Sequence, residues 1–454
     1  MKKRRDNYTF LTQAPVPKVI FTMATPTIVS MLVTSLYNMA DTFFVGRLNT
    51  QATAAVGIVF AFMSLIQAVG FFFGHGSGNY MSRHLGAREP EKARTMSSTG
   101  FVYSFCFGLL LMLVGEIWLS DFARMLGSTL TIQPYTEEYL GIVLLGAPLM
   151  TASLTINNQM RLQGNALFAM YGIMSGAVIN VVLDPVLIFV FHMGVKGAAL
   201  ATVAGQLCSF VILIYMSGQN GGIPITVRNF NRRLHYVKEI FYGGSPSLFR
   251  QGLAAFSTVA LNVSAGAFGD AAIAGMSIVT RYCFFILAVV IGLGQGFQPL
   301  CGFCFGARLY DRVRQGYMYC VKVGTAFLVV CAAVSAVFAE EIVELFRSDA
   351  EVVEIGAEAL RWQALTFVCL PTIILTNMLM QTIRKPLQAN IAAAARSGLY
   401  FIPLIIVMPR LMGLMGVVTC QSVSDVLSFA TCVPIAMAAF REMRRKQSCT
   451  PQGK

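Results

Sequence analysis

The sequence predicts an all-α membrane protein, with twelve transmembrane helices in two parallel six-helix lobes. Three observations predict this fold: an apolar composition, apolar stretches of span length along the whole chain, and an internal repeat. Of 454 residues, 56% are hydrophobic and only 12% are charged. Soluble globular domains carry about 25% charged residues, so this chain cannot cover a water-facing surface in the usual way.

The apolar stretches are continuous, as in FVYSFCFGLLLMLVGEIWL from Phe101 onward. A helix needs about 20 mainly apolar residues to cross a bilayer. A transmembrane β-strand would instead alternate apolar and polar residues, so a barrel is excluded. We expect spans at residues 19–45, 52–74, 97–119, 138–160, 167–191, 198–216, 241–268, 271–296, 317–339, 360–380, 387–408 and 413–440.

The formal net charge of +13 comes from Lys and Arg residues that lie between the apolar stretches. The largest basic groups are within residues 2–5, 83–94, 228–238 and 441–446, which all fall on one side of the membrane if the chain crosses twelve times. By the positive-inside rule that side is cytoplasmic, with both termini. The basic groups are therefore topology signals, and no nucleic-acid partner is expected.

The start of the chain, MKKRRDNYTFLTQAP, is basic but then polar where a cleavable signal peptide would be apolar. No cleaved leader is therefore expected before the first span. We expect a multi-pass protein of a bacterial cytoplasmic (inner) membrane, surrounded by membrane lipid.

An internal repeat relates the two halves. The segment GHGSGNYMSRHLGAREPEKAR from Gly74 aligns with GQGFQPLCGFCFGARLYDRVR from Gly294, and Pro26 aligns with Pro246. Six spans per half is an even number, so both halves run in the same direction, with a substrate path expected between them. The expected units are an N-terminal lobe over 1–216, a cytoplasmic linker over 217–240, and a C-terminal lobe with a basic tail over 241–454.

Ionisable residues inside the predicted spans are the main functional signal, because a charge in lipid is costly unless it faces a cavity or a partner. Asp41 and Asp184 are two such residues. Asn180 lies four residues before Asp184 and therefore on the same helix face. At 1.5 Å per residue, Asp41, Asp184 and Thr202 all lie roughly 6–11 Å beneath the outer membrane boundary. This common depth predicts one shared polar site.

The donor types at this site suit a coupling ion. Carboxylate, amide and hydroxyl oxygens are hard ligands that favour a hard cation such as Na⁺. Burial and a second nearby carboxylate both favour the protonated form, so the pair could equally hold H⁺. The alternatives are structural: Asp41 at the membrane interface, and Asp184 as a residue preceding a kink at Pro185.

The second half has no copy of these carboxylates. Its spans instead contain Arg250, Arg281, Arg396 and Asp425, which form a possible second polar site. An Arg–Asp ion pair is the simpler explanation for two of them.

The segments PTIVSMLVTSLYNMADTFFVGRL and INVVLDPVLIF, with the repeated Gly-Ala-Arg motif, resemble the multidrug and toxin extrusion (MATE) family. The segment GHGSGNYMSRHLG is similar to its bacterial DinF/MepA-like branch. The resemblance implies a V-shaped pair of lobes. By this resemblance, the family's cation-site positions correspond to Asp41, Asn180, Asp184 and Thr202. Asn157 corresponds to a nearby polar position, and Pro26 corresponds to the kink proline.

The function implied is secondary active efflux of small lipophilic, often cationic drugs by antiport with Na⁺ or H⁺, by a monomer without a cofactor. The alternative is a flippase for lipids or lipid-linked oligosaccharides, because arginines lining a cavity would suit a pyrophosphate. An enzyme is not expected, because the chain lacks an HExxH motif and its four histidines are scattered.

Overall fold

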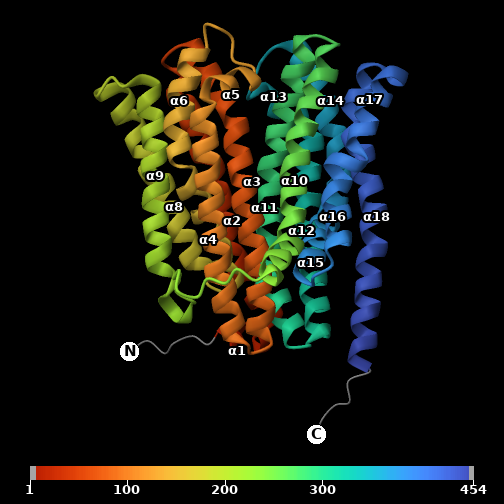
Figure 1. The fold of residues 1–454 in the computed structure, drawn as a ribbon. Helices are drawn as coiled ribbons and strands as arrows, with labels where there is room; N and C mark the ends of the chain where they lie inside the picture. Colours follow the sequence, from red (N-terminus) through yellow and green to blue (C-terminus); the bar gives the residue numbers. More distant parts are fainter. Residues whose placement is uncertain (1–6, 449–454) are drawn as a thin grey trace.

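The first half of the chain, as far as the structure describes it, forms helices and no strands. The computed structural model describes residues 7–448, which are drawn as a ribbon in Figure 1. Its first-half helices are α1 (Asn7–Gln13), α2 (Val16–Gly46), α3 (Thr50–Gly86), α4 (Pro90–Ile117), α5 (Leu119–Met125), α6 (Gln133–Leu145), α7 (Ala147–Leu162), α8 (Ala166–Pro185) and α9 (Gly194–Ser217). A π-helical turn, Val186–Val190, extends α8.

The second half repeats this order from α2 onward. Its helices are α10 (Leu234–Gly266), α11 (Asp270–Gly306), α12 (Tyr310–Val337), α13 (Ala339–Glu344), α14 (Ala350–Thr366), α15 (Leu370–Thr382), α16 (Pro386–Ala394), α17 (Phe401–Met412) and α18 (Leu414–Ser448). A second π-helical turn, Ala395–Leu399, joins α16 to α17. Short 3₁₀ turns lie at Gln219–Gly221 and Phe367–Cys369.

Each predicted span corresponds to a helix or to two consecutive helices. Within the described range, ten segments are long and apolar enough to cross a membrane, and α6 with α7, bent by 50°, would make an eleventh. The remaining predicted span is α10, which is long enough at 33 residues but carries a more polar sequence. Its polar residues, such as Ser247 and Ser257, are buried against other helices.

Several helices are longer than the sequence predicts, and α3 and α11 extend furthest past their predicted ends. The spans expected to end at residues 74 and 296 continue as α3 to Gly86 and as α11 to Gly306. The glycines that lower the apolar character of these segments do not end the helices, because tertiary packing stabilises them. Each helix ends in the same turn, with Arg88 and Arg308 both at φ 60°.

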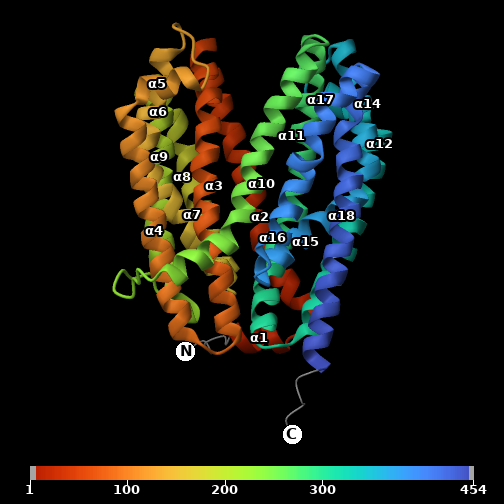
Figure 2. The ribbon, with the colours of Figure 1, turned by 45° about the vertical axis from the view of Figure 1, so that its right-hand side comes forward.

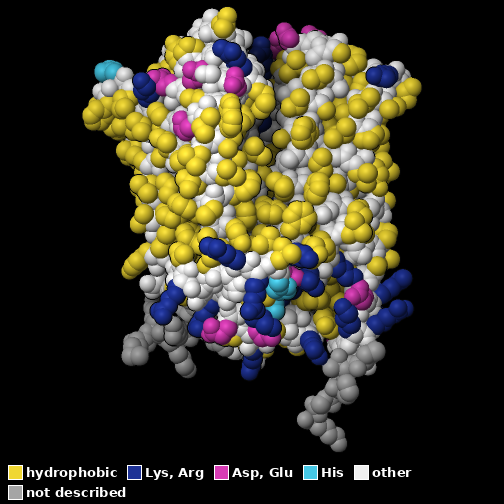
Figure 3. All heavy atoms as spheres, in the orientation of Figure 1, with side chains coloured by type: hydrophobic (Ala, Val, Ile, Leu, Met, Phe, Trp, Pro, Cys, Tyr) yellow, Lys and Arg dark blue, Asp and Glu magenta, His cyan; other side chains and the backbone are white. Residues whose placement is uncertain are grey.

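The two halves lie side by side and diverge toward one end. In Figures 1 and 2 α1 and the C-terminal end of α18 lie at the lower end, and the helix groups separate toward the upper end. Lys and Arg side chains gather around the lower end below an apolar belt, and a hollow separates the halves in the upper part of Figure 3. We call these the basic end and the open end.

Glycines bring the halves into backbone contact near the basic end. A Cβ on Gly86 would lie 2.2 Å from the Phe303 carbonyl oxygen, and a Cβ on Gly306 would lie 2.0 Å from the Arg83 carbonyl oxygen. Both distances are shorter than any real Cβ contact, so only glycine fits at either position. The two contacts are equivalent under the sequence repeat, and they hold α3 against α11.

Candidate functional site

Both predicted carboxylates lie in the first half, toward the open end. Asp41 is on α2, five residues before this helix ends at Gly46, and Asp184 is near the C-terminal end of α8. The two helices pack directly against each other, and α9 packs against α8. The Asp184 side chain is fully buried (0% exposed), and it interacts electrostatically with Asp41.

The amide and the hydroxyl predicted for this site lie in the same group. The Asn180 Nδ2 donates a hydrogen bond to Thr202 Oγ1 at 3.2 Å, which joins α8 to α9. Thr202 in turn donates to the Ala198 carbonyl oxygen at 3.0 Å. The structure therefore brings together Asp41, Asn180, Asp184 and Thr202, as their common depth predicts.

Two tyrosines that the sequence analysis missed complete this group. Tyr139 on α6 is buried and donates from its hydroxyl to Asp41 Oδ2 at 3.4 Å. It also interacts with Thr202 and Asp184. Tyr37 lies one helical turn before Asp41 on α2 and interacts electrostatically with both carboxyl groups. The i, i+4 spacing of Tyr37 and Asp41 could have predicted from the sequence that Tyr37 lies on the same helix face as Asp41.

The group is rich in buried oxygens without hydrogen-bond donors. Both Asp184 carboxyl oxygens, Asp41 Oδ1 and Asn180 Oδ1 are buried and lack a hydrogen-bond partner among the described residues. An isolated buried carboxylate is strongly unfavourable unless a proton or a cation neutralises it. Hard oxygen donors in this arrangement suit a Na⁺ ion or a proton. We call these four side chains, with Tyr37 and Tyr139, the acidic cluster.

Asn157, which the resemblance assigns to a polar position near the cation site, makes its hydrogen bond away from the acidic cluster. Its Nδ2 donates to the Ala169 carbonyl oxygen on α8 at 2.8 Å. Ala169 precedes Asn180 by eleven residues, which is roughly 16 Å along the helix. Asn157 thus ties α7 to the basic-end part of α8. Its repeat equivalent, Asn377, donates to Ala389 in the same way at 2.9 Å.

Pro26 lies inside α2, which continues on both sides of it. A proline in a helix removes one backbone hydrogen bond and favours bending there. The neighbouring Ala24 and Ile28 contact Gly296 and Gly292 of α11. Pro26 therefore lies at the contact between the two halves.

The polar residues of the second half do not form one site. Arg396 and Asp425 make the expected ion pair, with Arg396 Nε 2.8 Å from Asp425 Oδ1. Gln421 Nε2 also donates to this oxygen at 2.8 Å. Arg250 instead donates to Asn377 Oδ1 at 3.2 Å, and Arg281 is exposed on α11.

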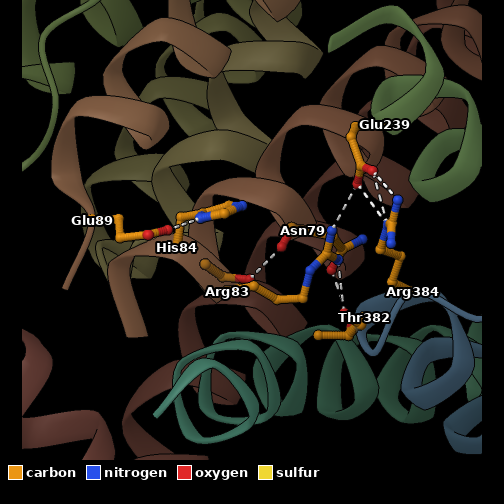
Figure 4. Close-up of polar contacts among 8 residues, drawn as sticks. Asn79, Arg83, His84, Glu89, Glu239, Thr382 and Arg384 are labelled. Atoms are coloured by element: carbon orange, nitrogen blue, oxygen red, sulfur yellow. Dashed lines mark hydrogen bonds and ion pairs between the residues drawn. The ribbon is translucent and has the colours of Figure 1, made fainter. Parts of the chain in front are cut away.

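A charged cluster closes the basic end between the halves (Figure 4). Glu239 on α10 is 3% exposed and lies between two guanidinium groups. Arg83 Nη2 of the first half lies 3.3 Å from Glu239 Oε2, and Arg384 Nε donates to Glu239 Oε1 at 2.8 Å. Arg83 also donates to the Thr382 carbonyl oxygen at 2.9 Å. These contacts span from α3 to the second half and stabilise the closed basic end.

A second charged group in Figure 4 stays within the first half. His84 Nδ1 lies 2.5 Å from Glu89 Oε2, and Lys92 Nζ lies 2.8 Å from Glu89 Oε1. Lys92 and His84 together lower the pKa of the Glu89 carboxyl below its usual value. Glu89 therefore provides a carboxylate at the same end of the molecule that does not bridge the halves.

Comparison with known proteins identifies the family. The MatE family profile matches residues 26–186 and again residues 246–407, one segment in each half of the chain. The chain belongs to the MATE family. This is a family of transporters, which confirms that the protein is not an enzyme.

Relatives and solved structures extend over almost the whole of this MATE protein. It is 26% identical over 442 residues to the multidrug export protein MepA of Staphylococcus haemolyticus, covering 96% of both chains. It is also 26% identical over 414 residues to MepA of Staphylococcus aureus strain MSSA476, covering 90% of this chain and 91% of MepA.

The fold matches a solved structure described as the outward-facing conformation of a multidrug resistance MATE family transporter of the MOP superfamily. The TM-score is 0.91 at 23% identity, with 98% of this chain and 100% of that chain covered. The predicted all-helical, multi-span fold is thereby confirmed, and the protein is a multi-pass membrane protein with bacterial relatives.

Proposed function

We propose that this MATE protein is a secondary active multidrug efflux transporter. It exports lipophilic, often cationic compounds by antiport with Na⁺ or H⁺. The observation that carries the proposal is the acidic cluster, in which three of the four carboxyl oxygens of Asp41 and Asp184 are buried without a hydrogen-bond partner in the described part of the chain. The similarity to MepA proteins, which are multidrug export proteins by name, supports the drug substrate.

We further propose that the basic end faces the cytoplasm of a bacterial inner membrane, with both termini. The Lys and Arg side chains around this end in Figure 3 support this orientation. In it, the hollow opens to the outside, and the structure is the outward-facing state of the transport cycle.

Transport then requires the two lobes, residues 1–216 and 241–454, to rock about their contact while the linker 217–240 stays connected to both. The contacts of Arg83 with Glu239 and Thr382 hold the basic end closed in this state and must break for substrate to enter from the cytoplasm. A rocking motion of this kind is the general scheme for transporters built from two repeats.

Coupling follows from the position of the acidic cluster. Asp41 lies on α2, which also packs against α11 of the other lobe. An ion that neutralises Asp41 and Asp184 changes how tightly α2 and α8 pack, and it thereby shifts the balance between the outward- and inward-facing states. It can shift this balance only by its difference in affinity for the two states.

The test is gradient-driven transport in proteoliposomes that contain purified protein. We expect an imposed Na⁺ or H⁺ gradient to drive accumulation of a fluorescent lipophilic cation, and we expect Asp41→Asn and Asp184→Asn each to abolish it. Each variant should still bind the cation in detergent, which shows that it is folded. Full gradient-driven transport by both variants would refute the acidic cluster as the coupling site.

A further inference from the structure

Three basic side chains meet between the two halves without a carboxylate. They are His75 of α3, Arg161 of α7 and Arg250 of α10, and Arg161 interacts electrostatically with the other two. Arg161 Nη2 donates to His75 Nε2 at 3.0 Å and to Asn158 Oδ1 at 2.6 Å, and Arg161 Nη1 donates to Gln295 Oε1 of the other half. Because arginine only donates, His75 accepts at Nε2 and is neutral, with its Nδ1–H directed to Ser247 at 2.9 Å.

The positive charges of Arg161 and Arg250 are not neutralised by the protein part that the structure describes. No ion pair involves either residue there, and the partners of their guanidinium groups are uncharged side chains. Arg161 is 3% exposed, and its Nε is buried without an acceptor. Arg83, Arg384 and Arg396 elsewhere in this protein each contact a carboxylate. Buried charges are normally paired, so two arginines that interact electrostatically and lack an ion pair in the described structure call for an anionic partner.

Arg250, unlike Arg161, is partly exposed. On α10 it shares a helix face with Ser247, Ser257 and Leu261, which are all buried, so its own partial exposure is directed inward and not toward lipid. Its Nη1 binds Asn377 at 3.2 Å, and its Nε and Nη2 have no hydrogen-bond partner within residues 7–448. These two donors form the edge of a guanidinium that binds carboxylates and phosphates in two parallel hydrogen bonds.

We propose that Arg250, with the charge of Arg161 behind it, binds the anionic group of an exported amphiphile at the closed end of the hollow. The ligand class is an apolar molecule that carries a carboxylate or a phosphate. This inference rests on the proposed export function and names an additional substrate class for it. The site is separate from the acidic cluster. The repeat equivalent of Arg250 in the first half is Ser30 of α2, so Arg250 is expected at the depth of Ser30. Ser30 precedes Asp41 by eleven residues, which is roughly 16 Å along the helix.

The test compares two substrates that differ only in charge. Proteoliposomes with wild-type protein or Arg250→Gln receive a fluorescent aromatic amine bearing a carboxylate, or the methyl ester of the same amine, under one gradient. Glutamine retains a donor for Asn377 but removes the charge. We expect Arg250→Gln to lower the transport rate of the acid by about tenfold, as for loss of a charge-assisted hydrogen bond, and to leave the ester within about twofold. Arg250→Lys should restore part of the acid transport.

Arg281→Gln is the matched control, because it removes the same charge from the neighbouring helix, and it should leave the rates of acid and ester unchanged. Equal losses for acid and ester in Arg250→Gln would overturn the anion site and indicate a structural role. Wild-type protein that exports the ester but not the acid would also overturn it, while leaving drug export intact. Failure to export either compound would instead contradict the proposed function.

A third set of vesicles identifies the source of the anion. It contains a fluorescently labelled anionic phospholipid, and its transfer between leaflets is followed by quenching. Transfer that depends on Arg250, together with export of neither small compound, would support the anion site with a lipid headgroup as its ligand. Export of the acid without lipid transfer would support a small anionic amphiphile.

Discussion

The two halves share a backbone plan but place their buried acids in different surroundings. In the first half, Asp184 is fully buried and neither of its oxygens has a hydrogen-bond donor among the described residues. In the second half, Asp425 is 2% exposed, but Arg396 and Gln421 both donate to it. In the second half, the positive charge that balances the buried carboxylate therefore belongs to a side chain, Arg396. In the first half, a bound ion that can dissociate would have to supply this charge.

This difference lies in the side chains and not in the helices. The contacts of Gly86 with Phe303 and of Gly306 with Arg83 are equivalent in the two halves, as are the hydrogen bonds of Asn157 and Asn377. A repeat can therefore keep its symmetry where the two halves touch while only one copy binds the coupling ion. Four predictions test this interpretation, beginning with the largest expected effect.

The first prediction contrasts neutralisation of acids in the two halves. Asp184→Asn should reduce gradient-driven transport to the leak of protein-free vesicles, because the ion no longer finds a charge. The double variant Arg396→Gln, Asp425→Asn should retain transport within about threefold, because replacing both members of a buried pair is often nearly neutral. The rates are measured in proteoliposomes at equal protein content. If the double variant lost transport while Asp184→Asn retained it, the coupling ion would have to bind in the second half and not in the first.

The second prediction concerns stability. Asp425→Asn alone leaves Arg396 without its counter-charge and should destabilise the protein by about 3 kcal/mol, at the low end for a broken buried pair. The double variant should recover most of that loss. Asp184→Asn should not destabilise and should raise the unfolding temperature in detergent, because it removes a buried charge that lacks a partner. Thermal unfolding of the three variants checks this order, and a destabilised Asp184→Asn would speak against the first-half interpretation.

How far the sequence predicts these features differs from residue to residue. The depth of Asp41, Asp184 and Thr202 follows from helix rise and span direction, so their meeting was predictable. The place of Tyr139 was not, because it depends on the rotation of α6 and on the 50° bend between α6 and α7. The hydrogen bond of Asn157 to Ala169 was not predictable either, because family resemblance assigns a position without its partner.

The same limit applies to the fold. Spans and their order follow from apolar stretches, and the parallel halves follow from the repeat. The extra length of α3 and α11 does not, because hydropathy cannot distinguish glycines that end a helix from glycines that pack against another one. The pairing of Glu239 with Arg83 was equally out of reach, since it requires knowing which faces of α10 and α3 meet.

The third prediction addresses the contact between the halves. Glu239→Gln removes the carboxylate held by Arg83 and Arg384 and should favour separation at the basic end. Cys304, fully buried near this end on α11, should then react with a maleimide several-fold faster. Modification at Cys304 is followed by mass spectrometry. Glu89→Gln is the control, since the described ion-pair partners of Glu89, His84 and Lys92, belong to its own half. Equal acceleration in both variants would argue against Glu239 as the closing contact.

The fourth and smallest effect is expected at Tyr139. Tyr139→Phe removes one hydrogen bond to Asp41, worth about 0.5–1.5 kcal/mol, and should change the ion concentration for half-maximal transport by about 2–10-fold. The maximal rate should change less. Asn157→Ala, which is outside the acidic cluster, should leave this concentration unchanged. If Asn157→Ala changed the half-maximal ion concentration by the same factor, residues outside the acidic cluster would also determine ion affinity.

The glycine contacts between α3 and α11 also affect how fast the transporter can turn over. At Gly86 and Gly306 the two helices touch through backbone atoms, so parting them at these two points needs no change of side-chain rotamer. Such a surface can open and close many times and return to the same fit. The rate of conversion between the two states is then set mainly by the ion pairs of Glu239 with its arginines, which single substitutions can strengthen or weaken. The glycine contacts keep the two halves in register.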